Sequence, residues 1–108
     1  MRTLFTLAAL GFAVGGCVST TDPMLEAPTQ VVYSEQDPDD IDYCLANAYA
    51  AVHPVARQKR EDGTTRLVFR NAATGWVRFA VRISPNEQGS RVEFWKGQDG
   101  IGWVEGCL

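Results

Sequence analysis

The sequence predicts an α+β fold: one N-terminal helix packed on a four- or five-stranded antiparallel sheet and closed by a disulfide. Over residues 38–51, apolar residues recur every three or four positions, which is the period of a helix. After Pro54 they alternate with polar residues, which is the period of a strand. One cysteine lies in each part, Cys44 in the helical segment and Cys107 near the C-terminus. We therefore expect one small two-layer domain over residues 37–108.

The helix is predicted over residues 38–51. Asp37 is a favourable N-cap residue, Pro38 suits the first helical position, and the two aspartates that follow complement the positive end of the helix dipole. The helix ends before Pro54, which disfavours helical geometry in the residue that precedes it. A calcium loop is an alternative for the aspartate run, but no glycine is placed for its turn. The predicted apolar face consists of Ile41, Cys44, Leu45, Ala48 and Val52.

Short strands separated by Gly, Pro and Asn turn signals are predicted after the helix. They cover residues 54–60, 65–70, 76–83, 90–95 and 101–105. The clearest alternation is in 76–83, where one side is formed by Val77, Phe79, Val81 and Ile83, and the other by Trp76, Arg78, Ala80 and Arg82. Short connections favour an antiparallel meander with one face buried against the helix.

The two cysteines of the domain are expected to form a disulfide. A Cys44–Cys107 bond closes a loop of about 63 residues and stabilises a small domain by about 4 kcal/mol in the chain-entropy model. The alternative is a metal site built from Cys44, His53 and Cys107, but it lacks a close ligand pair and offers only three ligands. We expect no metal and no cofactor.

The N-terminus has the composition of a secretory leader. A tip with one basic residue, Arg2, precedes the apolar run 4–14, and two small residues, Gly15 and Gly16, stand before Cys17. The run is too short to span a bilayer, which needs about 20 residues. Residues 1–16 are therefore predicted to be a signal peptide.

The stretch Val14-Gly15-Gly16-Cys17 resembles the lipobox of bacterial lipoproteins. The resemblance implies a diacylglyceryl thioether on Cys17, cleavage before it and acylation (palmitate) of the new N-terminus. Val18 stands where some inner-membrane lipoproteins carry Asp, so the resemblance favours the outer membrane, facing the periplasm. The alternatives are ordinary secretion with a free Cys17 and a buried helix of a cytosolic domain.

Residues 17–36 are predicted to be the lipidated cysteine and a flexible tether, because they contain two prolines, many small polar residues and no clear period. A short edge strand over 31–33 is an alternative for part of this segment. The folded domain is then expected to begin at Asp37.

Charge is segregated along the chain. Residues 18–52 carry seven acids and no Lys or Arg, whereas residues 53–108 carry nine bases and six acids, a net charge of +3. Arg and Trp on the open face of a sheet suit an anionic partner, such as lipid A phosphates, a peptidoglycan carboxylate or an acidic envelope protein. The alternative is that the arginines only keep an open sheet face soluble. The candidate partner-binding face consists of Arg66, Arg70, Trp76, Arg78, Arg82, Arg91 and Trp95.

Catalysis and nucleic-acid binding are not expected. His53 is the sole histidine, no serine stands in a nucleophile-elbow pattern, and nothing in the spacing brings Glu93 and Glu105 together. The plan of lipobox, tether, helix and sheet resembles small lipoproteins of the β-barrel assembly machinery. Trp95-Lys96-Gly97 and the late cysteine resemble lipoprotein-type lysozyme inhibitors. We expect a membrane-anchored binding or envelope-structural protein, with an enzyme inhibitor as the alternative.

Overall fold

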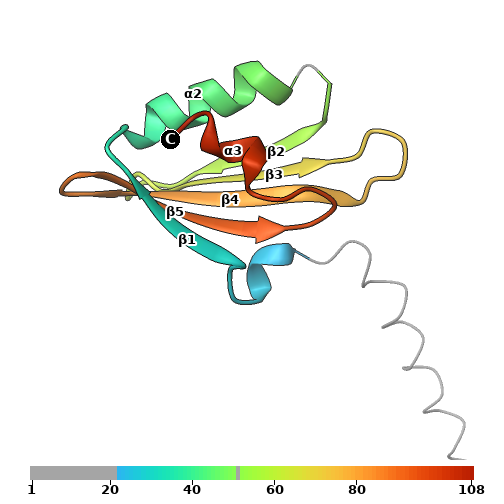
Figure 1. The fold of residues 1–108 in the computed structure, drawn as a ribbon, viewed down its shortest axis with the longest axis horizontal. Helices are drawn as coiled ribbons and strands as arrows, with labels where there is room; N and C mark the ends of the chain where they lie inside the picture. The colour runs from blue at the N-terminus through green and yellow to red at the C-terminus, as the bar shows by residue number, and fades with distance from the viewer. Residues whose placement is uncertain (1–21, 51) are drawn as a thin grey trace, which may run out of the picture.

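The computed structural model describes residues 22–50 and 52–108 and has two layers, a five-stranded antiparallel sheet and one main helix across one of its faces (Figure 1). The strand order is β1-β5-β4-β3-β2. The α+β prediction is confirmed. The predicted leader 1–16, Cys17 and residues 18–21 of the predicted tether lie outside the described residues. The elements are η1 (Pro23–Leu25), β1 (Gln30–Ser34), α2 (Pro38–Tyr49), β2 (Val55–Lys59), β3 (Thr65–Arg70), β4 (Val77–Asn86), β5 (Gly89–Lys96) and α3 (Gly102–Glu105).

The structured domain begins before the predicted boundary at Asp37. Strand β1 pairs with β5 along its whole length, so the tether prediction is wrong for residues 22–36, which form η1, an edge strand and their connections. Val32 is the residue of β1 that packs against the main core. One apolar contact in five residues is too weak a pattern to reveal a strand, and pairing with β5 decides it.

The prediction of a last strand over 101–105 is wrong, because these residues form the short helix α3 and its N-cap. Val104 is fully buried, and Ile101 and Cys107 pack against the same core. A spacing of three places all of these residues on one side of a helical turn, whereas a strand would turn alternate residues away from the core.

Helix α2 starts at the predicted position and ends at Tyr49, two residues early. Asp37 is the N-cap, although its side chain makes no capping hydrogen bond. Ile41 and Leu45 are buried as expected, but Val52 and Ala48 are exposed, and Tyr49 packs on the core in their place. Tyr49 makes T-shaped ring contacts with Phe69 and Phe79, with ring centroids 6.2 and 6.0 Å apart, which a smaller residue could not do.

Both faces of the sheet carry a hydrophobic cluster. The face under α2 holds the main core, made of Ile41, Leu45, Leu67, Phe69, Phe79, Val81, Ile83, Val92, Phe94 and Val104. The opposite face, called here the outer face, holds a smaller cluster made of Val68, Ala80 and Trp95, with Met24 and Val77 against it. Met24 comes from η1, which therefore covers part of the outer face.

A β-bulge in β4 corrects the predicted alternation. Phe69 pairs with Phe79 but Arg70 pairs with Val77, so Arg78 is the extra residue. Val77 consequently joins the outer cluster instead of the main core. Arg78 turns to the helix side, where its guanidinium lies 5.2 Å from the ring of Trp103 and its Nε donates to Asp99 at 2.7 Å.

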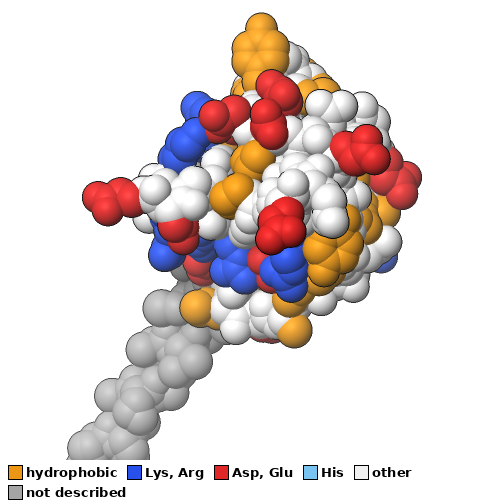
Figure 2. All heavy atoms as spheres, turned by 90° about the vertical axis from the view of Figure 1, so that its left-hand side faces the viewer, with side chains coloured by type: hydrophobic (Ala, Val, Ile, Leu, Met, Phe, Trp, Pro, Cys, Tyr) orange, Lys and Arg blue, Asp and Glu red, His pale blue; other side chains and the backbone are white. Residues whose placement is uncertain are grey.

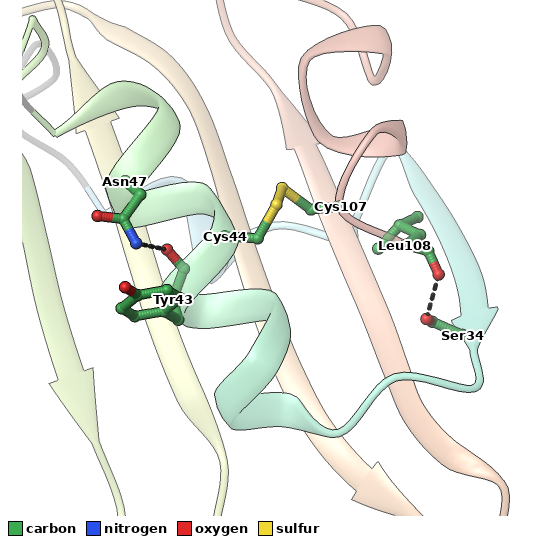
Figure 3. Close-up of a disulfide and its surroundings, with 6 residues drawn as sticks. All are labelled: Ser34, Tyr43, Cys44, Asn47, Cys107 and Leu108. Carbon is green, nitrogen blue, oxygen red and sulfur yellow. Dashed lines mark hydrogen bonds between the residues drawn. A yellow bond between two sulfur atoms is a disulfide. The ribbon is translucent and has the colours of Figure 1, made fainter.

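The C-terminus is fixed to the helix and to β1 (Figure 3). Cys44 of α2 and Cys107 form a disulfide with their Cα atoms 5.7 Å apart, as predicted. One residue later, the main-chain oxygen of Leu108 accepts a hydrogen bond of 2.7 Å from the hydroxyl of Ser34. The two contacts join three segments that are far apart in sequence.

Removing the disulfide with the double change Cys44→Ala and Cys107→Ala should lower the free energy of unfolding by about 4 kcal/mol, because a 63-residue separation is no longer constrained in the unfolded chain. Urea unfolding of the oxidised protein, with and without reductant, measures this. The double variant should be insensitive to reductant. Equal stability of the oxidised and reduced native chains would contradict the prediction.

Gly97→Ala should lower the free energy of unfolding by about 1–3 kcal/mol, because a methyl group there would overlap the carbonyl oxygen of Val77 beside the bulge. That oxygen also accepts a hydrogen bond of 3.1 Å from the amide of Gln98, so it cannot move freely. The matched control is Gly102→Ala, whose new methyl group meets nothing within 4 Å. Equal thermal midpoints for the two variants would refute this.

Candidate functional site

The predicted binding face is only partly assembled. Arg66, Arg82, Arg91 and Trp95 lie on the outer face, as does Arg70 at the rim of a hollow there. Arg78 lies on the helix side because of the bulge, so its inclusion in this face is wrong. Trp76 stands in the β3–β4 loop, 61% exposed.

A buried carboxylate organises one half of the outer face. Glu93 accepts two parallel hydrogen bonds from Arg82, of 2.7 and 2.9 Å, and lies 3.2 Å from Nη1 of Arg91. The hydrogen bonds from Arg82, together with the charges of both arginines, hold the pKa of Glu93 below its usual value. The guanidinium of Arg82 also lies 5.4 Å from the ring of Trp95.

A second carboxylate comes from the segment that precedes β1. Asp22 accepts a hydrogen bond of 2.9 Å from the amide of Met24 and forms an ion pair with Arg66. Burial alone would raise the pKa of Asp22, but these two donors hold it below its usual value. Arg66 also donates to Gln58 at 2.8 Å and contacts the sulfur of Met24. Sequence reasoning missed Asp22 and Met24, because nothing periodic surrounds them.

Counter-charges are needed here because Arg66 and Arg82 are direct cross-strand neighbours. Like charges in this position destabilise a sheet. Asp22 lies beside the first and Glu93 beside the second, so each guanidinium has a carboxylate partner. The ion pair of Asp22 with Arg66 and the burial of Met24 therefore both stabilise the packing of η1 on this face.

Trp95 is a structural residue of this face and does not contribute an exposed surface. It is 4% exposed, beneath η1, and its indole N–H donates to the carbonyl of Glu26 at 2.8 Å. Gly97 is required by the close approach of Val77. Packing thus accounts for Trp95 and Gly97 of the Trp-Lys-Gly segment, and the inhibitor alternative gains no support from them.

Two open hollows flank the covered centre of the outer face. One, of about 230 Å³, is lined by Asp22, Pro23, Ala56, Arg57, Gln58, Arg66, Val68 and Arg70. The other, of about 300 Å³, is lined by Arg60, Asp62, Thr64, Arg82, Ser84, Arg91 and Glu93. The side chain of Arg70 donates only to the carbonyl of Gly75, at 3.1 Å, and Arg60 forms no ion pair within the described residues. Sequence reasoning missed Arg60, because it placed this residue inside the predicted strand 54–60, whereas β2 ends at Lys59.

The opposite side of the molecule is acidic. The aspartates at the start of α2 follow Glu35, and two of their carboxylates pair with β2, Asp42 with Arg57 and Asp39 with Lys59. Figure 2 views the end of the molecule where α2 begins and β2 ends: acidic side chains lie mainly in its upper and middle parts, and most visible basic side chains lie lower. The charge segregation of the sequence is therefore partly kept in space, although Asp22 of the acidic segment pairs with Arg66 on the outer face.

The described residues offer no cluster of three His, Cys, Asp or Glu side chains suited to a metal ion. The disulfide consumes both thiols of the alternative metal site, so that alternative is wrong. Glu93 and Glu105 do not face each other, because Glu93 is on the outer face and Glu105 is in α3 on the helix side. His53 packs edge-on against Trp103, with ring centroids 6.0 Å apart. Among the described residues, two buried side-chain oxygens have no hydrogen-bond partner, Asp42 Oδ1 and Thr65 Oγ1.

Glu93→Gln should lower the free energy of unfolding near neutral pH by about 1–3 kcal/mol, because Arg82 loses charged hydrogen bonds. The pKa of Glu93 is lowered by folding, so its contribution is complete above the ordinary glutamate pKa of about 4.3 and is lost as the pH falls through the lowered value. Urea unfolding between neutral and acidic pH should show that the free energy of unfolding falls less steeply in the variant than in the parent protein. Glu87→Gln, at an exposed position in the β4–β5 turn, serves as the control, and identical pH profiles for all three proteins would contradict the assignment.

The outer face is thus a partly covered sheet surface with paired carboxylates and spare guanidinium groups. Among the described residues, no helix is long and apolar enough to cross a membrane. No protein-family model, curated protein or solved structure matches this chain.

Proposed function

We propose that this chain is a lipoprotein of the bacterial cell envelope, with an α+β domain that faces the periplasm and acts by binding. In this proposal the leader 1–16 directs export and is removed, and Cys17 carries the lipid that holds the domain on the membrane. Val18 after the cysteine favours the outer membrane. The domain serves as a binding or structural component, and no enzymatic activity or cofactor is proposed.

The Cys44–Cys107 disulfide is the observation that supports this proposal best. Structural disulfides persist in oxidising compartments and are rare in the cytosol. The bond also uses two of the three cysteines of the chain and leaves Cys17, directly after the predicted leader. A leftover cysteine at the end of a lipobox-like stretch has a chemical role as the acceptor of the lipid thioether.

The lining of the outer face supports a binding role. Its two hollows are open, and guanidinium groups line both of them. Guanidinium groups suit phosphate or carboxylate on a partner, because their planar fork offers two parallel donors. The partner is therefore proposed to be an anionic envelope component or the acidic surface of an envelope protein.

The protein extracted from its native membrane in detergent should have the mass of a chain that starts at Cys17 plus acyl groups, and should lack two hydrogen atoms relative to the dithiol form. Intact mass spectrometry without reductant measures both features. The Cys17→Ser variant should lack the acyl mass and leave the membrane fraction. A chain that retains residues 1–16, with free thiols, would refute the proposal.

A further inference from the structure

We infer that the outer face of the sheet, together with η1, lies against the anionic headgroup surface of the membrane that holds the lipid anchor. This inference rests on the proposed lipidation of Cys17 and adds the orientation of the domain and the chemistry of its contact. The occupant is the bilayer surface itself, recognised through its phosphate groups.

The first argument is the reach of the chain. Asp22 is held on the outer face by Arg66 and by the amide of Met24. The five residue steps from Cys17 to Asp22 span at most about 18 Å even when fully extended. The lipid is therefore attached close to the outer face, whereas α2 lies on the far side of the sheet (Figure 1). Docking through α2 would require this short segment to pass around a sheet edge.

The second argument is an exposed apolar residue beside this attachment. Met24 of η1 packs on the outer cluster, whereas the next residue, Leu25, is 76% exposed. A leucine exposed on a short helix can enter the headgroup region of a membrane. A tryptophan at the same position would also be favoured there, because its ring is partly apolar and partly wet.

The third argument is charge. Six arginines line the two hollows of the outer face, but one of them, Arg57, pairs with Asp42 of α2, whose acidic start lies on the other side. The carboxylates that line the same hollows are Asp22, Asp62 and Glu93, so the excess of positive charge on this face is small. A small excess is sufficient, because the anchor raises the effective concentration of the surface near the headgroups. Repulsion of the acidic side favours the same orientation.

Quenching of a tryptophan reporter by lipid tests the orientation. The lipidated full-length protein is reconstituted into vesicles of phosphatidylglycerol and phosphatidylcholine that contain a nitroxide-labelled lipid. Leu25→Trp places the reporter on η1, and the control, Tyr43→Trp, places it at a residue that is 73% exposed on α2. The η1 reporter should be quenched at least about twofold more than the α2 reporter, because only the outer face lies at the headgroups. The three native tryptophans are the same in both proteins.

A charge placed at the contact should weaken it. Arg60→Glu should reduce the quenching of the η1 reporter, whereas Val52→Glu, at a residue 64% exposed after α2, should not. Both positions are exposed, so folding is preserved and circular dichroism can check it. Replacing phosphatidylglycerol by phosphatidylcholine should also reduce the quenching, because the guanidinium groups then lose their anionic partner.

The outcomes separate the two proposals. An acylated Cys17 with equal quenching of the two reporters would overturn the orientation and leave the proposed lipoprotein standing, and the outer face would then be free for a protein partner. Quenching of the η1 reporter that is indifferent to Arg60→Glu and to lipid charge would also overturn the docking chemistry. A chain without acyl groups on Cys17 would remove the proposed function and this inference together.

Discussion

The structure depends on a row of aromatic rings across the middle of the sheet. Phe79 of the central strand β4 stacks on Phe69 at 4.6 Å and on Phe94 at 6.1 Å, and Tyr49 of α2 meets Phe79 at 6.0 Å. The three phenylalanines are almost completely buried. A slip of one residue in either neighbouring strand would turn these rings to the other face, so the row determines the register of β3, β4 and β5.

The register in turn decides what the outer face contains. It sets Arg66 opposite Arg82 and Arg82 opposite Glu93, so two guanidinium groups and one carboxylate are brought into a line. The remaining counter-charge, Asp22, comes from outside the sheet with η1, whose Met24 covers Trp95. The segment next to the proposed anchor is thereby fixed to the outer face, which is also the proposed binding surface.

The C-terminal segment closes the domain by linking elements that are far apart in sequence. The domain, residues 22–108, is small, and small domains bury a low fraction of their surface on folding. The disulfide joins the end of the chain to the middle of α2, and the hydrogen bond from Ser34 to Leu108 joins it to the edge strand β1. The small helix α3 lies between β5 and these contacts and adds Val104 to the core.

Local patterns were enough to predict the fold class, the position of α2, the four strands after it and the cysteine pair, because each has a local period, cap or count that needs no distant partner. Strand β1, helix α3 and the bulge at Arg78 could be found only in the folded molecule. Each depends on a contact with a residue far along the chain: β5 for β1, the core under α2 for α3, and Gln98 and Asp99 for the bulge. The same holds for the outer face: alternation predicted the side of the strands that Arg66, Arg82 and Arg91 occupy, but not that the bulge turns Arg78 away, which carboxylates neutralise the arginines, or that η1 buries Trp95. Those pairings join residues more than forty positions apart in the case of Arg66 and Asp22, and no local pattern records them.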